Sequence, residues 1–250
     1  MTRRLVFAAN WKMNVGPSEA RKYVTAFSPR FGARDDRSVV FFPSAISLTS
    51  VVHGFAARPD VGVGVQNISP EDKGAFTGET SAPMARDAGA SFALVGHSER
   101  RHVFGETDFE TGKKCAAAVR NGLTPILCVG ELLSEREAGT TGDVVLRQLA
   151  AGIADLSDDA VASMAIAYEP VWAIGTGKNA TPEDARAVHG QLRSALQSRI
   201  GRRATEVPVL YGGSVNIGNA KSLLAAQDVD GLLVGGASLD VDGWATICNT

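Results

Sequence analysis

The chain has 250 residues, of which 44% are hydrophobic and 21% are charged, so it can bury a large core and is not disordered. Its formal net charge of −2 at pH 7 argues against nucleic acid as a partner, because nucleic-acid-binding surfaces are strongly basic. Cys115, Cys128 and Cys248 are far apart and odd in number, which argues against a disulfide framework and favours a reducing, cytoplasmic location.

Membrane insertion and export are not expected from the apolar runs of the sequence. The first run, Leu5 to Ala9, is five residues long and ends in Asn10, which is too short for a signal peptide. No other run has the roughly 20 apolar residues that a membrane-spanning helix needs. We therefore expect no membrane partner.

Short apolar runs rich in β-branched residues alternate with helical segments along the whole chain. Such alternation is typical of repeated βα units. We expect eight strands, at Leu5 to Ala9, Val39 to Phe42, Val61 to Gln66, Phe92 to Gly96, Pro125 to Val129, Met164 to Tyr168, Val207 to Tyr211 and Gly231 to Val234. Because these strands are apolar throughout, they predict a parallel sheet that is covered on its faces.

Helix starts can be predicted at three places. Thr181 can cap a helix whose first turn contains Pro182, and an apolar stripe follows it. His189 lies near that stripe, so we expect it to pack in the core rather than bind a ligand. Ser18 and Ser81 are similar helix-start signals.

The chain is expected to form one domain over residues 1–250, because no linker, low-complexity segment or charge block divides it. Eight βα units of this total length are typical of a single-domain (β/α)₈ barrel with eight parallel strands. The alternative is a doubly wound open sheet. It is less favoured, because no GxGxxG fingerprint follows the first strand.

Polar residues follow several of the predicted strands, and the carboxyl ends of the strands form the active site in a barrel. Lys12 comes shortly after the first strand, His97 ends the fourth, and Glu169 follows the sixth, directly before Pro170. A base, an imidazole and a lysine suit removal of a proton beside a carbonyl group. No His, Cys or carboxylate group has the spacing of metal ligands, so we expect neither a metal nor a cofactor.

Glycine pairs follow the last two strands, in Tyr211-Gly212-Gly213-Ser214 and in Gly235-Gly236. The loops after strands 7 and 8 commonly bind phosphate in barrels. Glycine lets backbone N–H groups come close to such an anion, although paired glycines are otherwise ordinary turn residues. The sequence therefore favours a phosphorylated small molecule as the ligand.

The segment after Glu169 is unusually apolar for a loop. Val171 to Ile174 are all apolar, and Gly175 and Gly177 follow them. Two interpretations are open: a lid that closes over the site and excludes water, or a connection that is packed permanently on the core.

These segments together resemble the triosephosphate isomerase family. The matching segments are Asn10-Trp11-Lys12-Met13-Asn14, Gly74 to Ser81, Gly96 to Arg101, Pro125 to Glu131, Tyr168 to Lys178, Tyr211 to Val215 and Gly235-Gly236. The resemblance implies interconversion of D-glyceraldehyde 3-phosphate and dihydroxyacetone phosphate, without a cofactor, through an enediol or enediolate in glycolysis and gluconeogenesis.

The resemblance also implies a role for each site residue. Glu169 would be the base, His97 the electrophile, Lys12 the contact to the substrate anion and Asn10 a polar partner at the substrate oxygens. The backbone N–H groups that would bind the phosphate belong to Gly175, Ser214, Gly235 and Gly236. Charged residues beneath the site would form a network, although from sequence alone they could equally be solvated pairs; these are Glu99, Arg100 and Glu106.

A homodimer is the last expectation. The segment Gln66 to Thr80 is longer than the usual βα loop of about 2–6 residues and carries an apolar Phe76. In the family this loop inserts beside the site of the neighbouring subunit, which would bring Thr77 close to the partner's Lys12. Two alternatives to the isomerase remain: a sugar-phosphate aldolase or synthase, and a noncatalytic sugar-phosphate-binding barrel.

Overall fold

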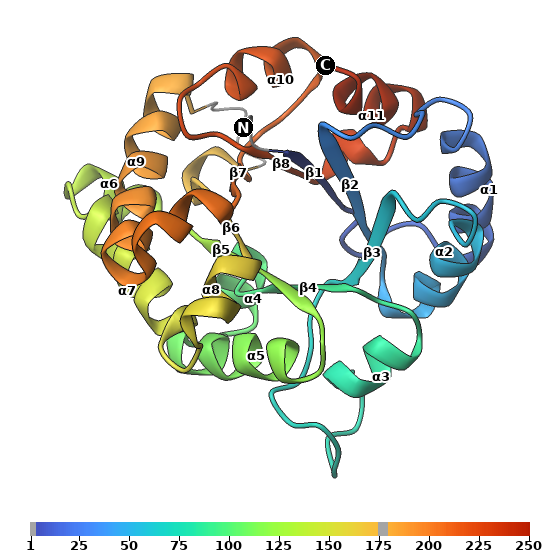
Figure 1. Cartoon of the computed structure of the whole chain (residues 1–250), viewed down its shortest axis with the longest axis horizontal. Coiled ribbons are helices and arrows are strands. Elements are labelled where there is room, and N and C mark those ends of the chain that lie inside the picture. Colours follow the sequence, from blue (N-terminus) through green and yellow to red (C-terminus); the bar gives the residue numbers. More distant parts are fainter. Residues whose placement is uncertain (1–3, 175–179) are drawn as a thin grey trace.

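The computed structural model describes residues 4–174 and 180–250. In these ranges eight parallel strands close into a barrel in chain order, with β8 pairing with β1. Figure 1 looks down this ring. The strands are β1 (Leu5–Asn10), β2 (Arg37–Phe42), β3 (Val61–Val65), β4 (Phe92–Val95), β5 (Thr124–Val129), β6 (Ala165–Tyr168), β7 (Val209–Tyr211) and β8 (Gly231–Val234). The predicted (β/α)₈ barrel is confirmed.

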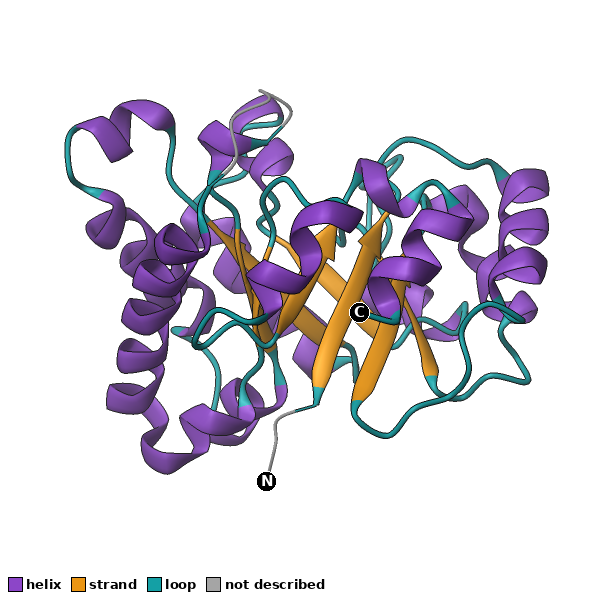
Figure 2. Ribbon diagram, turned by 90° about the horizontal axis from the view of Figure 1, so that it is seen from above, coloured by secondary structure: helices purple, strands orange, loops and turns teal. Residues whose placement is uncertain are grey.

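Helices cover the outside of the ring, and all strands point toward the same end of it (Figures 1 and 2). The α-helices are α1 (Pro17–Phe27), α2 (Leu48–Gly54), α3 (Ala82–Asp87), α4 (Ser98–Val103), α5 (Asp108–Arg120), α6 (Leu133–Glu137), α7 (Thr141–Ile153), α8 (Asp158–Ser163), α9 (Pro182–Ile200), α10 (Ile217–Leu224) and α11 (Val241–Cys248). Short 3₁₀ helices are η1 (Ala45–Ser47), η2 (Val171–Ala173), η3 (Gly201–Glu206) and η4 (Gly236–Ser238).

The pairing of the strands is uneven around the ring. β1 and β2 are in register over their full lengths, from Leu5 with Arg37 to Asn10 with Phe42. β7 and β8 share only the pair Tyr211 with Leu232. At this seam Asp230 adds its own bonds to Val209: its N–H donates to the Val209 carbonyl at 2.8 Å, and its carboxylate accepts from the Val209 N–H at 2.9 Å.

Both faces of the barrel strands are buried, as their apolar sequences predict. One cluster, which includes Val40 and Ile126, fills the interior of the ring. The larger cluster lies between the strands and the helices, where Trp11, Phe41 and Trp244 are completely buried. Two layers of apolar side chains therefore fix the strands that carry the site.

The start of α9 agrees with the sequence prediction. The Thr181 hydroxyl accepts from the Asp184 N–H at 3.1 Å, and the Asp184 carboxylate accepts from the Thr181 N–H at 2.9 Å. This reciprocal capping box satisfies N–H groups that the helix leaves unpaired. His189 on the same helix is completely buried and packs edge-on against Tyr168, so it is a core residue, as predicted.

The predicted helix start at Ser18 was wrong by two residues. α1 begins at Pro17, and Gly16 occupies the capping position. Proline suits the first turn of a helix because its fixed φ is helical and its missing N–H would have no partner there. The Glu19 carboxylate then accepts from the Gly16 N–H at 3.2 Å. Ser81, by contrast, caps α3 as expected, accepting from the Met84 N–H at 3.3 Å.

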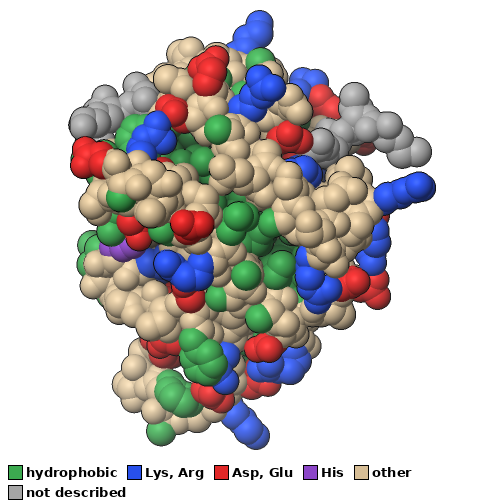
Figure 3. All heavy atoms as spheres, turned by 90° about the vertical axis from the view of Figure 1, so that its left-hand side faces the viewer, with side chains coloured by type: hydrophobic (Ala, Val, Ile, Leu, Met, Phe, Trp, Pro, Cys, Tyr) green, Lys and Arg blue, Asp and Glu red, His purple; other side chains and the backbone are tan. Residues whose placement is uncertain are grey.

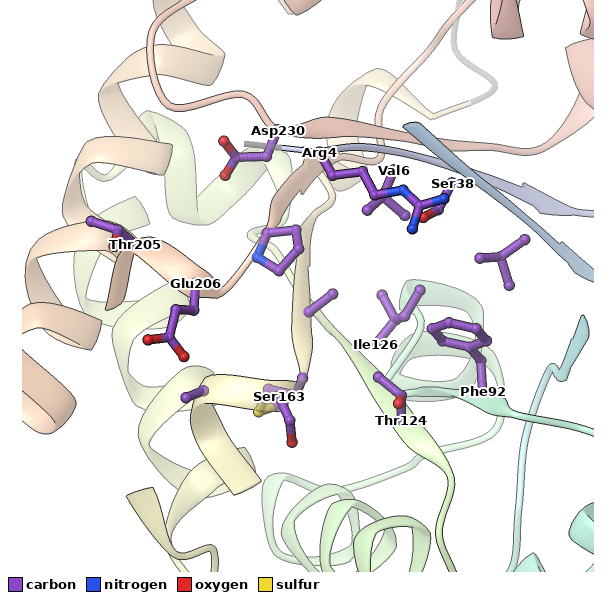
Figure 4. A pocket seen from close by; sticks show the side chains of 15 residues that line it. Arg4, Val6, Ser38, Phe92, Thr124, Ile126, Ser163, Thr205, Glu206 and Asp230 are labelled. Atoms are coloured by element: carbon purple, nitrogen blue, oxygen red, sulfur yellow. The ribbon is translucent and has the colours of Figure 1, made fainter. Parts of the chain in front are cut away.

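A cavity of about 460 Å³ lies at the amino ends of the strands (Figure 4). Its apolar wall belongs to the filling of the barrel, for example Ile126. Its two acidic lining residues have cationic partners: Asp230 lies 2.5 Å from Arg193, and Glu206 lies 3.4 Å from Arg203. The cavity is the open lower end of the barrel core.

Charges of both signs are interspersed on the face of the molecule shown in Figure 3. This distribution agrees with the small net charge and forms no cationic stripe on that face. Within the described ranges, no helix combines the length and the apolar character needed to cross a membrane.

Candidate active site

A cavity of about 280 Å³ at the carboxyl ends of the strands brings the predicted site residues together. Its lining comes from the ends of β1, β4, β6, β7 and β8. The predicted residues in the lining are Asn10, Lys12, His97, Glu169, Ser214, Gly235 and Gly236. Gly175 lies outside the described residues. Residues that are far apart in sequence thus share one cavity.

Lys12 occupies a strained backbone position at the end of β1. Its φ of 52° lies in the left-handed region, which is uncommon for residues other than glycine. The buried Asn10 side chain stabilises this turn, because its Oδ1 accepts from the Lys12 N–H at 3.0 Å. The Lys12 ammonium lies 2.6 Å from the Glu99 carboxylate. The turn therefore holds a cation at the edge of the cavity.

His97 follows β4 and caps α4. Its Nδ1 accepts a hydrogen bond from the Glu99 backbone N–H at 3.2 Å, so Nδ1 carries no proton in this arrangement. The proton of the neutral ring is then on Nε2, which lies 3.1 Å from Oε1 of Glu169. The fold thus presents a neutral N–H donor to the cavity.

Glu169 is almost completely buried directly after β6. Its own N–H extends the sheet to the Val129 carbonyl at 2.8 Å. Its carboxylate accepts from the Ser98 N–H at 2.9 Å and from the Ser98 hydroxyl at 3.2 Å. A side chain at Gly130 would come within 1.8 Å of the Glu169 carbonyl oxygen. Only glycine therefore allows the two strand ends to approach in this way.

Close contacts surround two of the glycines after β7 and β8, most tightly at Gly213. A Cβ atom at Gly213 would lie 2.2 Å from the Tyr211 hydroxyl, and one at Gly235 would lie 3.2 Å from Cε of Lys12. Gly236 begins η4, and the first N–H groups of a helix have no acceptor inside it. Together with Ser214, these positions form a wall of the cavity that backbone N–H groups can line.

A buried charge network lies beneath His97. The resemblance implied such a network for Glu99, Arg100 and Glu106, and Arg100 and Glu106 belong to it. The Glu106 carboxylate accepts from the Gly96 N–H at 3.0 Å, from Arg100 at 3.3 Å and from Lys114 at 2.5 Å. Lys114 was not predicted from the sequence, and it is as buried as Glu106. Glu99 has a different role, because it pairs with Lys12 at the cavity edge.

The first part of the apolar segment after Glu169 is packed on the barrel. Val171–Ala173 form η2, and Ala173 is completely buried. The Trp172 indole N–H donates to Glu131 at 2.8 Å, and the Arg136 guanidinium lies 4.3 Å from the centre of a Trp172 ring. These residues match the interpretation of a packed connection. The predicted lid residues Gly175, Thr176 and Gly177 lie outside the described part of the chain.

Glu131 supports the segment after Glu169, and its role was not predicted from the sequence. It is completely buried and also accepts from the Tyr168 hydroxyl at 3.1 Å. Burial raises the pKa of Glu131 above its usual value, although the bonds from Trp172 and Tyr168 act in the opposite direction. Its position directly after β5 and Gly130 was the available signal.

Metal or thiol chemistry finds no support in the described residues. No group of three or more His, Cys, Asp or Glu side chains in residues 4–174 and 180–250 could hold a metal ion. Cys128 is buried next to Glu169, and burial raises the pKa of its thiol well above the usual value. It packs at the end of β5 rather than presenting a reactive thiolate.

Comparison with known proteins gives one consistent match. A sequence profile of the family described as Triosephosphate isomerase matches residues 5–250. A Triosephosphate isomerase of Moorella thermoacetica is 48% identical over 99% of this chain and 98% of its own length. That of Symbiobacterium thermophilum is 45% identical over 98% of this chain and 96% of its own length. That of Streptococcus suis is 44% identical over the full length of both chains.

Proposed function

Because the chain belongs to the triosephosphate isomerase family, we propose that this cavity interconverts D-glyceraldehyde 3-phosphate and dihydroxyacetone phosphate, a step of glycolysis and gluconeogenesis. The reaction moves a proton between adjacent carbons through an enediol or enediolate. It needs a base beside the carbon and hydrogen-bond donors beside the oxygens. A glutamate base with a neutral histidine is the known pairing of this family.

Glu169 is the proposed base. Its carboxylate accepts from the Ser98 N–H and from the Ser98 hydroxyl, and its Oε1 lies 3.1 Å from Nε2 of His97. To reach a carbon of the substrate, the carboxylate has to exchange its bonds to Ser98 for the substrate, so we expect Ser98 to position the base before the reaction.

His97, Lys12 and Asn10 are the proposed partners of the substrate oxygens. A neutral imidazole that donates from Nε2 can give a hydrogen bond to the carbonyl oxygen while negative charge develops there. Lys12 adds a positive charge on the same side of the cavity, where water is partly excluded and electrostatic stabilisation is strong. The backbone N–H groups of Gly175, Ser214, Gly235 and Gly236 would bind the phosphate.

The position of Glu169 between Ser98 and His97 is the observation that carries this proposal. A coupled assay for conversion of glyceraldehyde 3-phosphate to dihydroxyacetone phosphate tests it. Glu169→Gln keeps the shape of the side chain and removes the base, so turnover should fall at least ~10³-fold while inorganic phosphate still binds. Near-normal turnover of the purified variant would exclude Glu169 as the base.

The two alternatives considered from the sequence are not favoured. Membership in this family points to isomerisation rather than to an aldolase, a synthase or a noncatalytic barrel. A Schiff-base aldolase would be trapped by borohydride in the presence of substrate, and a metal-dependent enzyme would lose activity with a chelator. We expect neither treatment to reduce isomerase activity.

A homodimer is a second part of the proposal. Several large apolar side chains are exposed, among them Met13, Phe76 and Phe104. A second cavity of about 220 Å³ adjoins the site and is lined by Met13, Phe104 and Lys12, among others. We propose that the loop of residues 66–80 of a second copy inserts its apolar tip into this cavity. Thr77 would then lie near the partner's Lys12.

Thr77→Arg tests the homodimer. A bulky cation brought toward Lys12 should prevent association and give monomers of reduced activity, which sedimentation and the coupled assay would record. Glu79→Gln, on the same exposed loop, is a matched control that should remain dimeric. A wild-type chain that sediments as a monomer at micromolar concentration would contradict the proposal.

The cytoplasm is the proposed location, and one domain over residues 1–250 the proposed organisation. Cys115, Cys128 and Cys248 are all buried free thiols, which suits a reducing compartment.

A further inference from the structure

The loop of residues 66–80 stands away from its own barrel, between β3 and α3 (Figure 1). Residues 71–79 are all exposed. The base of the loop is closed by a hydrogen bond from the Ser69 N–H to the Thr80 carbonyl at 2.8 Å. Inside the tip, the N–H groups of Phe76 and Glu79 donate to the carbonyls of Gly74 and Phe76, each at 3.0 Å. The loop has its own internal structure but little core beneath it.

One side chain of the exposed part ties the loop to the barrel. The Asp72 carboxylate accepts from Arg120 twice, with its oxygens at 2.8 and 3.4 Å from the two guanidinium nitrogens. It also accepts from the Asn121 amide at 3.0 Å. The same amide nitrogen donates to the Ala117 carbonyl at 2.9 Å, so Asn121 is itself fixed on the end of α5.

A second attachment of this loop to α5 lies nearer its root. Lys114 of α5 donates to the Asn67 side chain at 2.8 Å, at the root of the loop. Lys114 also donates to Glu106, which accepts from the Gly96 N–H beside His97. α5 therefore holds the loop at Asn67 and at Asp72, and it is connected to the turn that carries the catalytic histidine.

A single exposed ion pair contributes little, because solvent screens it and two long side chains must be ordered. Asp72 differs in that one short carboxylate accepts three hydrogen bonds from two residues at the end of one helix. A paired guanidinium and carboxylate also fixes direction, not only distance. The geometry suits a group that sets where the loop tip lies.

We propose that Asp72, bound to Arg120 and Asn121, positions the loop tip in the free subunit for insertion into a second copy of this chain. The inference rests on the proposed homodimer and goes beyond it by naming what orders the loop before association. A preordered tip loses less conformational freedom on binding, which raises affinity without any new contact. Asp72 is thus a positioning residue that acts through Arg120 and Asn121 on the place of the loop tip.

Sedimentation over a concentration series tests the proposal. Asp72→Ala should raise the dimer dissociation constant about tenfold, because a few more side chains would have to become ordered on association. It should also speed hydrogen exchange at residues 73–79. At protein concentrations that saturate the dimer, its kcat should equal the wild-type value. Asp159→Ala is the matched control, because it removes an equally charged, exposed partner of Arg203 far from this loop. It should leave the dissociation constant unchanged.

Exchange of the two charges separates positioning from simple loss of stability. Asp72→Arg and Arg120→Asp should each weaken the dimer, and the double variant should recover most of the affinity. An Asp72→Ala dimer as tight as wild type, or a charge exchange without recovery, would overturn the role of Asp72 alone. A wild-type monomer would instead refute the homodimer and this inference together.

Discussion

Two histidines in this barrel have opposite hydrogen-bonding states because their backbone partners differ. Nδ1 of His97 faces an N–H group, that of Glu99, and therefore accepts. Nδ1 of His189 lies 2.9 Å from the Asp228 carbonyl oxygen, which can only accept, so this nitrogen carries the proton. One ring presents an N–H to the active-site cavity, and the other is a buried neutral group. A single backbone contact decides which histidine suits catalysis.

His189 should make the stability of the protein depend on pH. Burial lowers the pKa of His189 to about 4, below the ordinary value near 6.5. Its contribution is therefore fully present above about pH 6.5 and is lost as the pH falls toward 4. From these two pKa values the loss between pH 7 and pH 5 is about 2 kcal/mol.

His189→Gln removes this titration, so its free energy of unfolding should change less between pH 7 and pH 5 than that of the wild type. Urea unfolding at both pH values and one fixed protein concentration provides the measurement. His53 is exposed at the end of α2, and His53→Gln is the control. Equal pH dependence of His189→Gln and wild type would show that the buried ring does not titrate in this way.

The side chains that touch the cavity could be predicted from the sequence, whereas those that support them could not. Lys12, His97 and Glu169 stand directly at the ends of apolar strands, so the order of strand and polar residue marks them. Glu131 and Lys114 act through contacts with residues about 40 positions away, Trp172 and Asn67. Spacing along the chain carries no information about such partners.

At the scale of single elements, the capping box of α9 should have a measurable effect. Thr181 and Asp184 satisfy two N–H groups at the start of this 19-residue helix, directly after residues 175–179. Thr181→Ala should lower the free energy of unfolding by about 1 kcal/mol, measured by urea denaturation. Thr181→Ser keeps the hydroxyl and should lose little or nothing, because serine caps helices at least as well as threonine. Equal losses in the two variants would exclude the hydroxyl as the cause.

Strand positions were predicted to within about two residues, and the errors have local causes. β2 begins at Arg37, a charged residue that no apolar pattern would include. Its guanidinium leaves the sheet and donates to the Cys248 carbonyl at 2.6 Å. β7 begins only at Val209, because Pro208 has no N–H for the ladder. Long-range side-chain contacts and missing donors, rather than the apolar pattern, set these boundaries.

At the scale of the whole molecule, the end of the chain is part of the barrel. α11 buries Trp244 and Ile247 completely. Arg37, in register with Leu5 at the start of β1, also donates to the Thr250 carbonyl at 3.1 Å. One buried arginine thus links the first strands to the last residues, a contact that the sequence did not suggest.

The weak pairing between β7 and β8 gives the ring a preferred place to open. Local opening starts where few backbone bonds must break, and here the Asp230 amide reports it directly through its bond to Val209. This amide should exchange its hydrogen faster than the Leu5 amide, which bonds to Asp36 beside the fully paired β1 and β2.

Substrate would change the local opening between β7 and β8, because the loops after these strands form one wall of the active-site cavity. In the proposed site, a phosphate bound by the backbone N–H groups of Ser214 and Gly235 would connect the ends of β7 and β8. Saturating inorganic phosphate should therefore slow exchange at the Asp230 amide more than at the Leu5 amide, as hydrogen-exchange mass spectrometry or NMR can measure. Equal slowing at both amides would mean that the anion stabilises the barrel as a whole and has no specific effect between β7 and β8. The proposed phosphate site would then have a second effect, because its ligand would stabilise the barrel between the two strands that share a single residue pair.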